Sequence, residues 1–206
     1  MVCPKQSNPN KVDIWCQTDY TVSSIPGFYG DIPGLPPLGD FVIKNGVASL
    51  NNATERSGGN RVVTLPSDVK EVADKGFYKA SVVKLDLNDG LQKIGVGAFC
   101  GNELLFQVEI PASVKEIGRL AFMACNLRKV DLKCKLSKLP ERCFAWNENI
   151  DLFTGLENVP VNGIDPSAFD DSKVTFVLDE NDTEHIEFAN KIGAKVINRN
   201  GELING

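Results

Sequence analysis

A unit of about 22 residues recurs along the middle of this 206-residue chain, and it constrains the fold more than any other feature. The stretch 105–122, LFQVEIPASVKEIGRLAF, shows the frame: alternating apolar and polar residues, a proline turn, an apolar pair three apart, and a closing Ala-Phe. The closing phenylalanines are 22, 23, 22 and 25 residues apart and are Phe77, Phe99, Phe122, Phe144 and Phe169. A unit this short cannot bury its own apolar face, so such units are stable only when stacked on one another.

Two more apolar columns keep the same phase over the five units. One lies five residues before each phenylalanine and comprises Val72, Ile94, Ile117, Leu139 and Ile164. The other lies eight residues before it and comprises Val69, Leu91, Val114, Leu136 and Val161. The alternation predicts a short strand in each unit, paired in parallel with its neighbours, and the phenylalanines are expected to stack as a ladder. Where Gly95 and Gly118 follow the apolar pair, we expect a sharp bend of the backbone.

Residues 108–122 resemble the BspA-type leucine-rich repeat almost position for position, through the motif I-P-x-x-V-x-x-I-G-x-x-A-F. Residues 40–47 are similar to the hairpin that often precedes such arrays, and residues 174–196 to the strand-helix-strand that closes them, so the resemblance covers about residues 40–198. It implies a leucine-rich-repeat right-handed solenoid, a β-rich α/β fold with short parallel strands, about five coils of 22–25 residues and a C-terminal capping helix. It also implies binding to other macromolecules, commonly on the outside of cells.

We expect one continuous domain, because a chain of this length supports one sizeable core. Its predicted parts are an N-terminal strap or cap and hairpin packed on the solenoid (1–60), the leucine-rich repeats (61–178) and a C-terminal strand-helix-strand cap (179–206). Asn181 and Glu184 predict a capping pair for a helix over 182–192, and Gly193 predicts its end. The longer interval of the fifth unit inserts residues 154–157, which are expected to form a loop on one face.

Composition excludes several partners. The chain is 42% hydrophobic and 24% charged with a net charge of −5, so it lacks the basic surplus that nucleic acids attract. No apolar run approaches the roughly 18–20 residues of a membrane-spanning helix, so we expect no membrane insertion. The first twenty residues contain no apolar core of a signal peptide. The family resemblance nevertheless implies a cell-surface or secreted protein, and a cytoplasmic location is the alternative.

The residues that carry chemistry form no recognisable constellation. The cysteines show neither a C-x-x-C pair nor zinc-ligand spacing and are Cys3, Cys16, Cys100, Cys125, Cys134 and Cys143. Cys125 is interpreted as a small buried filler, a Cys100–Cys125 disulfide stays open although its geometry is unfavourable, and Cys3 could pair with Cys16 in an oxidising compartment. With His185 as the single histidine, we predict no catalytic site, no metal and no cofactor.

Superposing the strands aligns their outward polar residues. One column contains Asp86, Glu109 and Asp131, and the adjacent column contains Lys84, Gln107 and Lys129. Neighbouring strands are about 4.8 Å apart, so the carboxylates should repel one another, and the lysines only soften this. Our hypothesis is that these six residues line a strip that contacts a ligand, and the alternative is an ordinary solvated face.

A second column alternates in sign and is expected to stabilise the stack: Glu71, Lys93, Glu116 and Lys138. Together these features predict a non-catalytic leucine-rich-repeat protein that recognises a protein or glycan, with surface adhesion as a candidate role. The alternative is a cytoplasmic interaction scaffold or regulator. The predicted caps cover the open ends of the stack, so a monomer is expected.

Overall fold

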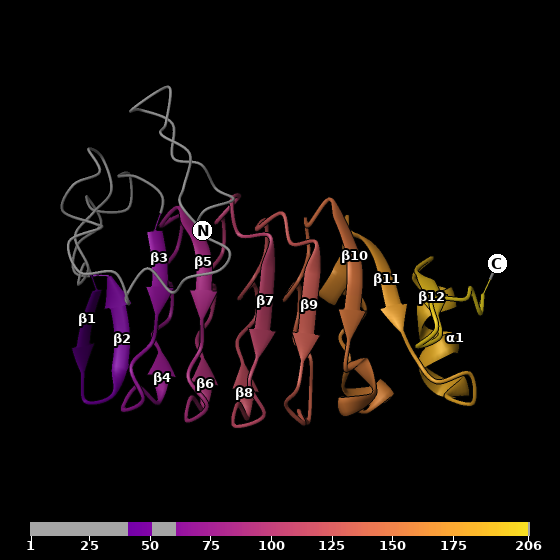
Figure 1. Cartoon of the computed structure of the whole chain (residues 1–206), viewed down its shortest axis with the longest axis horizontal. Coiled ribbons are helices and arrows are strands. Elements are labelled where there is room, and N and C mark those ends of the chain that lie inside the picture. Colours follow the sequence, from indigo (N-terminus) through magenta and orange to yellow (C-terminus); the bar gives the residue numbers. More distant parts are fainter. Residues whose placement is uncertain (1–40, 51–60, 206) are drawn as a thin grey trace, which may run out of the picture.

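The computed structural model describes residues 41–50 and 61–205. In this part of the chain the repeat units stand side by side in one row that ends at helix α1 (Thr183–Lys191) (Figure 1). The longer strands follow one another along the row and are β3 (Arg61–Thr64), β5 (Val82–Asp86), β7 (Gln107–Ile110), β9 (Lys129–Leu132), β10 (Asn149–Thr154), β11 (Lys173–Val177) and β12 (Lys195–Ile197). Strand β3 pairs with β5, and the other five form one sheet in the order β12-β11-β10-β9-β7, with every pairing parallel.

A second sheet runs beside these strands and is built from the short return segment of each unit. It begins with an antiparallel hairpin of β1 (Phe41–Lys44) and β2 (Val47–Leu50), followed in parallel by β4 (Glu71–Val72), β6 (Lys93–Ile94) and β8 (Glu116–Ile117). The hairpin predicted near residues 40–47 is therefore present. Its turn residues Asn45 and Gly46 both have positive φ, which a two-residue hairpin turn of the type favoured by right-twisted strands requires.

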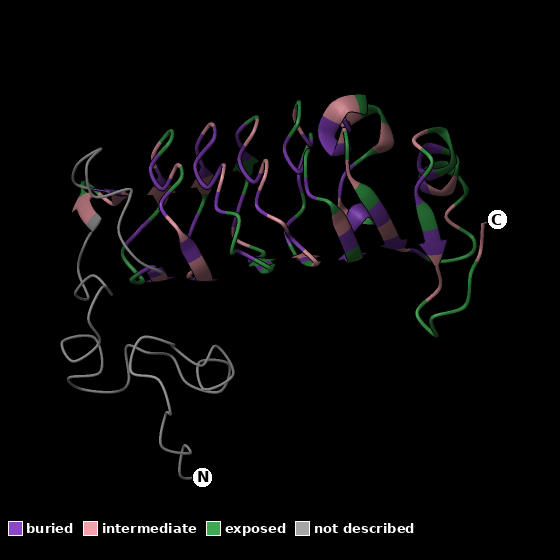
Figure 2. Ribbon diagram, turned by 90° about the horizontal axis from the view of Figure 1, so that it is seen from above, coloured by how far each residue is buried: buried purple, intermediate pink, exposed green. Residues whose placement is uncertain are grey.

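Buried residues recur in each unit along the row (Figure 2), and their side chains form one continuous hydrophobic core. The phenylalanine ladder is present as predicted: neighbouring rings of Phe77, Phe99, Phe122 and Phe144 are stacked, with centroids 5.4, 5.4 and 5.5 Å apart. The rings of Phe144 and Phe169 are also stacked, but from Phe144 onwards the packing changes, because Phe153 and Phe176 from β10 and β11 meet the ladder edge-on. Each buried phenylalanine removes about 150–250 Å² from water, so this column dominates the apolar core.

A polar column that the sequence did not single out runs beside the ladder, three residues after each phenylalanine from Phe99 onwards. In the second repeat it is occupied by Asn102, which is fully buried. Its Oδ1 accepts hydrogen bonds from the backbone N–H groups of Ala80 (3.1 Å) and Val82 (2.9 Å), and its Nδ2 donates to the carbonyl of Phe77 (2.9 Å). One amide therefore satisfies both donors and acceptors of the preceding repeat, where the turn leaves backbone groups without ladder partners.

The same column continues towards the C-terminus with different chemistry. Asn147 repeats the arrangement of Asn102 two units later. Between them, the Sγ of Cys125 donates to the carbonyl of Phe99 at 3.1 Å, and after them the hydroxyl of Ser172 donates to the carbonyl of Phe144 at 3.0 Å. Cys125 is buried, as expected, but it is a hydrogen-bonding member of this column as well as a filler of space.

The glycines after the apolar pair serve close packing between repeats. A Cβ on Gly95 would lie 2.6 Å from the backbone nitrogen of Asp74, and one on Gly118 would lie 2.5 Å from that of Val96. The backbone bends here as expected, because the carbonyls of Gly95 and Gly118 accept turn hydrogen bonds from the N–H groups of Ala98 and Ala121, at 3.3 Å each, although neither glycine has positive φ. Their missing side chain lets the return segments of consecutive units approach.

The fifth unit contains 3₁₀ helices, and the first of them overlaps the insertion of residues 154–157 that was expected to form a loop. They are η4 (Leu156–Asn158), η5 (Val161–Gly163) and η6 (Pro166–Phe169). Gly155 begins the departure with φ +86, and a Cβ there would lie 1.9 Å from the carbonyl oxygen of Leu132. Only glycine fits this position, because the backbone is left-handed and touches the preceding strand.

Helix α1 occupies the predicted position, but a different residue caps it. The side chain of Asp182 accepts from the backbone N–H of His185, whereas Asn181 bonds Asp179. The predicted capping pair of Asn181 and Glu184 was therefore off by one residue at its N-cap. Gly193 follows the helix with φ +72, the conformation that commonly ends a helix.

Candidate functional site

The six residues of the predicted strip lie on three consecutive strands of the row. Lys84 and Asp86 belong to β5, Gln107 and Glu109 to β7, and Lys129 and Asp131 to β9. The register pairs Gln107 with Lys129 and Glu109 with Asp131, and β5 lies next to β7 (Figure 1). All six side chains are half-buried or exposed. The structure thus brings them together on one outward surface, called here the strand face.

Threonines flank the carboxylate column at both ends. The hydroxyl of Thr64 donates to Oδ2 of Asp86 at 3.2 Å, and the hydroxyl of Thr154 donates to Oδ1 of Asp131 at 2.9 Å. Lys84 also lies 3.5 Å from the same oxygen of Asp86. These contacts hold the outer carboxylates in defined orientations across the strands.

Lys133 is a member of this surface that the strand alignment did not reveal. Its Nζ lies 2.5 Å from Oε1 of Glu109 and 3.8 Å from Oδ2 of Asp131. The hydrogen bond to Glu109, followed by the charges of the carboxylates, raises the pKa of Lys133 above its usual value. The repulsion expected among the carboxylates of the column is therefore offset by a lysine of the same chain. The signal available in the sequence was a lysine directly after β9, within reach of two strands.

An exposed apolar pair lies directly before β7. Leu104 is 40% exposed and Phe106 is 41% exposed, whereas Leu105 between them is fully buried. Because Leu105 and Val108 both point inward, two successive residues, Phe106 and Gln107, remain outside. Strict alternation counted back from Val108 would have placed Phe106 in the core, which is why sequence reasoning missed it.

The alternating column on the short sheet forms as predicted over three strands. Nζ of Lys93 lies 3.4 Å from Glu71 on one side, and Lys93 is in register with Glu116 on the other. The charge of Glu71 and then that of Glu116 raise the pKa of Lys93. Lys138 belongs to none of the described strands, so the ladder ends at Glu116.

The four cysteines of the described residues are free thiols. The disulfide between Cys100 and Cys125 that the sequence left open is therefore not formed, and Cys3 and Cys16 lie outside the described residues. Burial raises the pKa of Cys125 to about 12 and that of Cys134 to about 11. Burial also raises the pKa of Cys100 and, most strongly, that of Cys143. Such thiols are protonated at neutral pH and react slowly.

The described part of the chain contains neither a cluster of metal-ligating side chains nor a helix suited to cross a membrane. Residues 41–50 and 61–205 contain no group of three His, Cys, Asp or Glu side chains placed to hold a metal ion. None of the helices in these ranges has the length and apolar character needed to span a bilayer.

The repeated strand, return segment and phenylalanine column define a leucine-rich repeat protein. Comparison with family models matches residues 39–190 to the BspA type leucine rich repeat region, in six copies, and the chain belongs to this family. Among solved structures, the crystal structure of the T. pallidum leucine rich repeat protein (TpLRR) is similar at 25% identity and a TM-score of 0.41. The match covers 65% of this chain and 59% of that one. The search of curated proteins finds no match.

Proposed function

We propose that this protein is a non-catalytic recognition module whose strand face binds a protein ligand, in the service of adhesion at the cell surface. In this proposal the repeats form a right-handed solenoid closed at its C-terminal end by α1. The observation that carries the proposal is the exposure of Phe106 and Leu104 beside the ordered charges of the strip. The frequent surface association of the BspA-type family supports the location.

The composition of the strand face suits a protein better than a glycan. Binding energy at protein interfaces concentrates on a few aromatic or large side chains, surrounded by polar groups that exclude water. Phe106 supplies the exposed aromatic group, and Glu109, Asp131 and Lys133 supply polar groups already held by one another. Because their orientations are set before binding, little side-chain entropy would be lost on association.

The second candidate is a cytoplasmic scaffold or regulator, which the four free thiols favour. These thiols do not oppose an extracellular location, because burial protects them from oxidation. The two candidates share the strand face and differ in the partner. The binding experiment therefore distinguishes them.

The test is surface plasmon resonance of the intact protein against purified extracellular-matrix proteins, with a glycan array and soluble cell proteins in parallel. A saturable matrix-protein interaction is expected, weakened about tenfold or more by Phe106→Ala. The charge-reversal variant, with Asp86→Lys, Glu109→Lys and Asp131→Lys combined, should abolish it. Circular dichroism would verify that both variants fold.

The matched control reverses three exposed carboxylates away from the strand face: Glu157→Lys, Glu180→Lys and Glu187→Lys. It changes the net charge by the same amount and should leave binding intact. A matrix interaction that survives both strand-face variants would contradict the assignment of the site. Binding confined to soluble cell proteins would replace adhesion by the scaffold role.

A further inference from the structure

Trp146 lies exposed in the turn that follows Phe144, one of the phenylalanines of the ladder. Its side chain is 52% exposed, the highest value of any aromatic residue among those described. Its positive φ of +57 is shared by the equivalent position of each described repeat, which is occupied in the others by Lys79, Gly101, Ala124 and Asp171. What distinguishes this repeat is therefore the residue and not the backbone, since a large aromatic side chain is left in contact with solvent.

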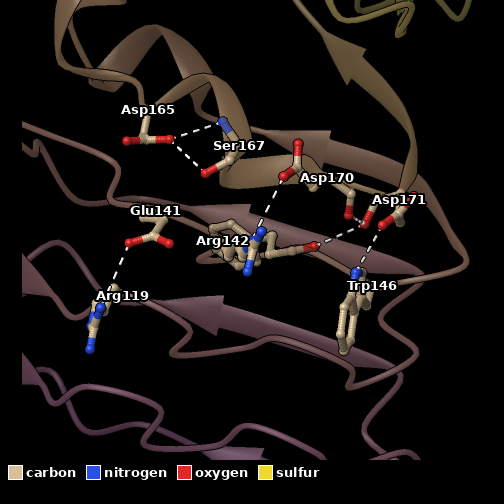
Figure 3. A network of polar contacts seen from close by, with 10 residues as sticks. Arg119, Glu141, Arg142, Trp146, Asp165, Ser167, Asp170 and Asp171 are labelled. Atoms are coloured by element: carbon tan, nitrogen blue, oxygen red, sulfur yellow. Dashed lines mark hydrogen bonds and ion pairs between the residues drawn. The ribbon is translucent and has the colours of Figure 1, made fainter.

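The indole ring is held in one orientation. Its Nε1 donates to Oδ2 of Asp171 at 2.9 Å, and the backbone N–H of Trp146 donates to the carbonyl of Asp170 at 2.8 Å (Figure 3). The residue after Asp171 is held as well, because the hydroxyl of Ser172 accepts a hydrogen bond from the backbone N–H of Asn147 at 2.9 Å. The ring edge is therefore bound to the protein, while half of the side chain stays in contact with solvent.

A hollow lies beside Asp171, the residue that holds the indole, although Trp146 itself is not one of its lining residues. Its volume is about 550 Å³, and its lining includes Glu148, Asp170, Asp171, Lys173, Phe169 and Ile192. Sites for small molecules occupy roughly 300–1,000 Å³ and combine apolar walls with a few convergent polar groups. This hollow has both properties, and it uses none of the residues of the strip.

Charge around the hollow is mixed. Nε of Arg142 lies 3.8 Å from Oδ2 of Asp170, and Asp171 is bound to the indole. Lys173 on the lining adds a second cation. The carboxylates are thus partly compensated: Figure 3 shows Arg142 beside Asp170 and the indole of Trp146 on Asp171. A strongly cationic peptide would find little excess negative charge here, whereas a polyhydroxylated ligand needs both kinds of partner.

We propose that Trp146 and the adjoining hollow form a binding site for one sugar unit of a neutral glycan. The apolar C–H face of a pyranose ring would lie on the indole, whose face carries negative charge density. Sugar hydroxyls would donate to Asp170, Asp171 and Glu148 and accept from Lys173, all of which line the hollow. This site is additional to the protein-binding strand face proposed above and does not depend on it.

The test uses an array of neutral oligosaccharides, followed by titration of the best ligand while tryptophan fluorescence is recorded. The titration is done in a Trp15→Phe background, so that all emission comes from Trp146. A saturable change is expected. Trp146→Ala should weaken binding on the array about tenfold or more, because stacking and apolar contact are both lost.

Asp171→Asn is the discriminating variant. The amide oxygen still accepts from the indole N–H, so the ring stays in place and a neutral ligand should lose less than about threefold in affinity. Raising the salt concentration should have little effect on a neutral ligand. The Asp86→Lys, Glu109→Lys, Asp131→Lys variant should bind the glycan like the unaltered protein.

Three results would overturn the proposal: no oligosaccharide that binds, a glycan that binds Trp146→Ala equally well, or binding limited to a lysine-rich decapeptide and abolished by salt or by Asp171→Asn. The last result would assign the surface to a basic peptide by cation–π contact. Thermal unfolding of each variant separates loss of binding from loss of fold.

Discussion

The side-chain amide of Asn147 donates a hydrogen bond to the carbonyl of Phe122, 3.0 Å away in the preceding repeat. The same Nδ2 donates to the carbonyl of Phe144 at 2.8 Å, and Oδ1 accepts from the N–H groups of Cys125 and Leu127. A single buried amide therefore connects two stacked units through four backbone groups. Because these groups are away from water, no solvent molecule can replace the side chain without a cavity.

Asn147→Leu should be among the most destabilising single changes in the chain. Leucine has a similar size but leaves two buried N–H groups and two carbonyls without this partner, at about 1–3 kcal/mol for each group that stays unsatisfied. We expect a loss of about 3–5 kcal/mol in the free energy of unfolding, measured by urea denaturation. Asn162→Leu, at an exposed position, is the control and should change stability by less than about 0.5 kcal/mol. Equal effects of the two substitutions would contradict a structural role for the buried column.

The extent to which the sequence predicted these features depends on whether they repeat. Asp86, Glu109 and Asp131 could be aligned because a regular period superposes equivalent strand positions, and the register confirms the alignment of the last two. Phe106 could not, because its outward position depends on two successive outward residues before β7. Lys133 lies beyond its strand, so its contact depends on the reach of one side chain.

The buried asparagines show a second reason why the sequence alone did not predict every feature. Asn102 and Asn147 are visible in the sequence as polar residues three places after a phenylalanine, but asparagine is typical of exposed turns. Only the stacking of units shows that this turn is covered and that its backbone groups need partners. Cys125 obscured the column further, because a thiol was interpreted as apolar filler.

The charge ladder of the short sheet predicts a salt-dependent effect. Lys93→Glu would put three carboxylates in line, Glu71, the new side chain and Glu116, where an ion pair of 3.4 Å now exists. All three positions are at the surface, so the expected loss is below about 1 kcal/mol. Thermal unfolding should show a lower midpoint in dilute buffer and a smaller difference at high salt. Lys70→Glu, at an exposed position outside the three-residue ladder, is the comparison. A salt-independent loss would point to packing instead of charge.

Buried thiols should make stability fall at alkaline pH. The pKa of Cys134 is raised to about 11 and that of Cys125 to about 12 by burial, against about 8.5 in an unfolded chain. The folded state therefore keeps these protons while the unfolded state releases them. The contribution of these two thiols to the free energy of unfolding is complete below about pH 8.5. It is lost as the pH rises towards their pKa values in the folded state. Urea unfolding under reducing conditions should show a shallower decline between about pH 8 and 10.5 in a Cys125→Ala, Cys134→Ala variant. Identical slopes would contradict this origin, since lysine and tyrosine titrations are shared by both proteins.

His185 joins helix α1 to the last repeat unit. Its Nε2 lies 2.8 Å from the carbonyl oxygen of Val159, and its Nδ1 lies 2.8 Å from Oδ1 of Asp182, the residue that caps the helix. His185→Leu replaces the buried imidazole by an apolar side chain and leaves the carbonyl of Val159 without its hydrogen-bond partner. The expected cost in stability is about 1–3 kcal/mol.

Amide hydrogen exchange should show that the stability lost in His185→Leu is lost at helix α1. Protection of residues 183–191 is expected to fall, while amides of the central repeats keep theirs, because stacked units open from their ends more readily than from their middle. The control is Glu187→Leu on the exposed face of the same helix, which leaves both contacts of His185 intact. Loss of protection spread evenly over all repeats would show that α1 unfolds only with the whole stack. In that case the bond to Val159 would contribute to global stability instead of docking the helix.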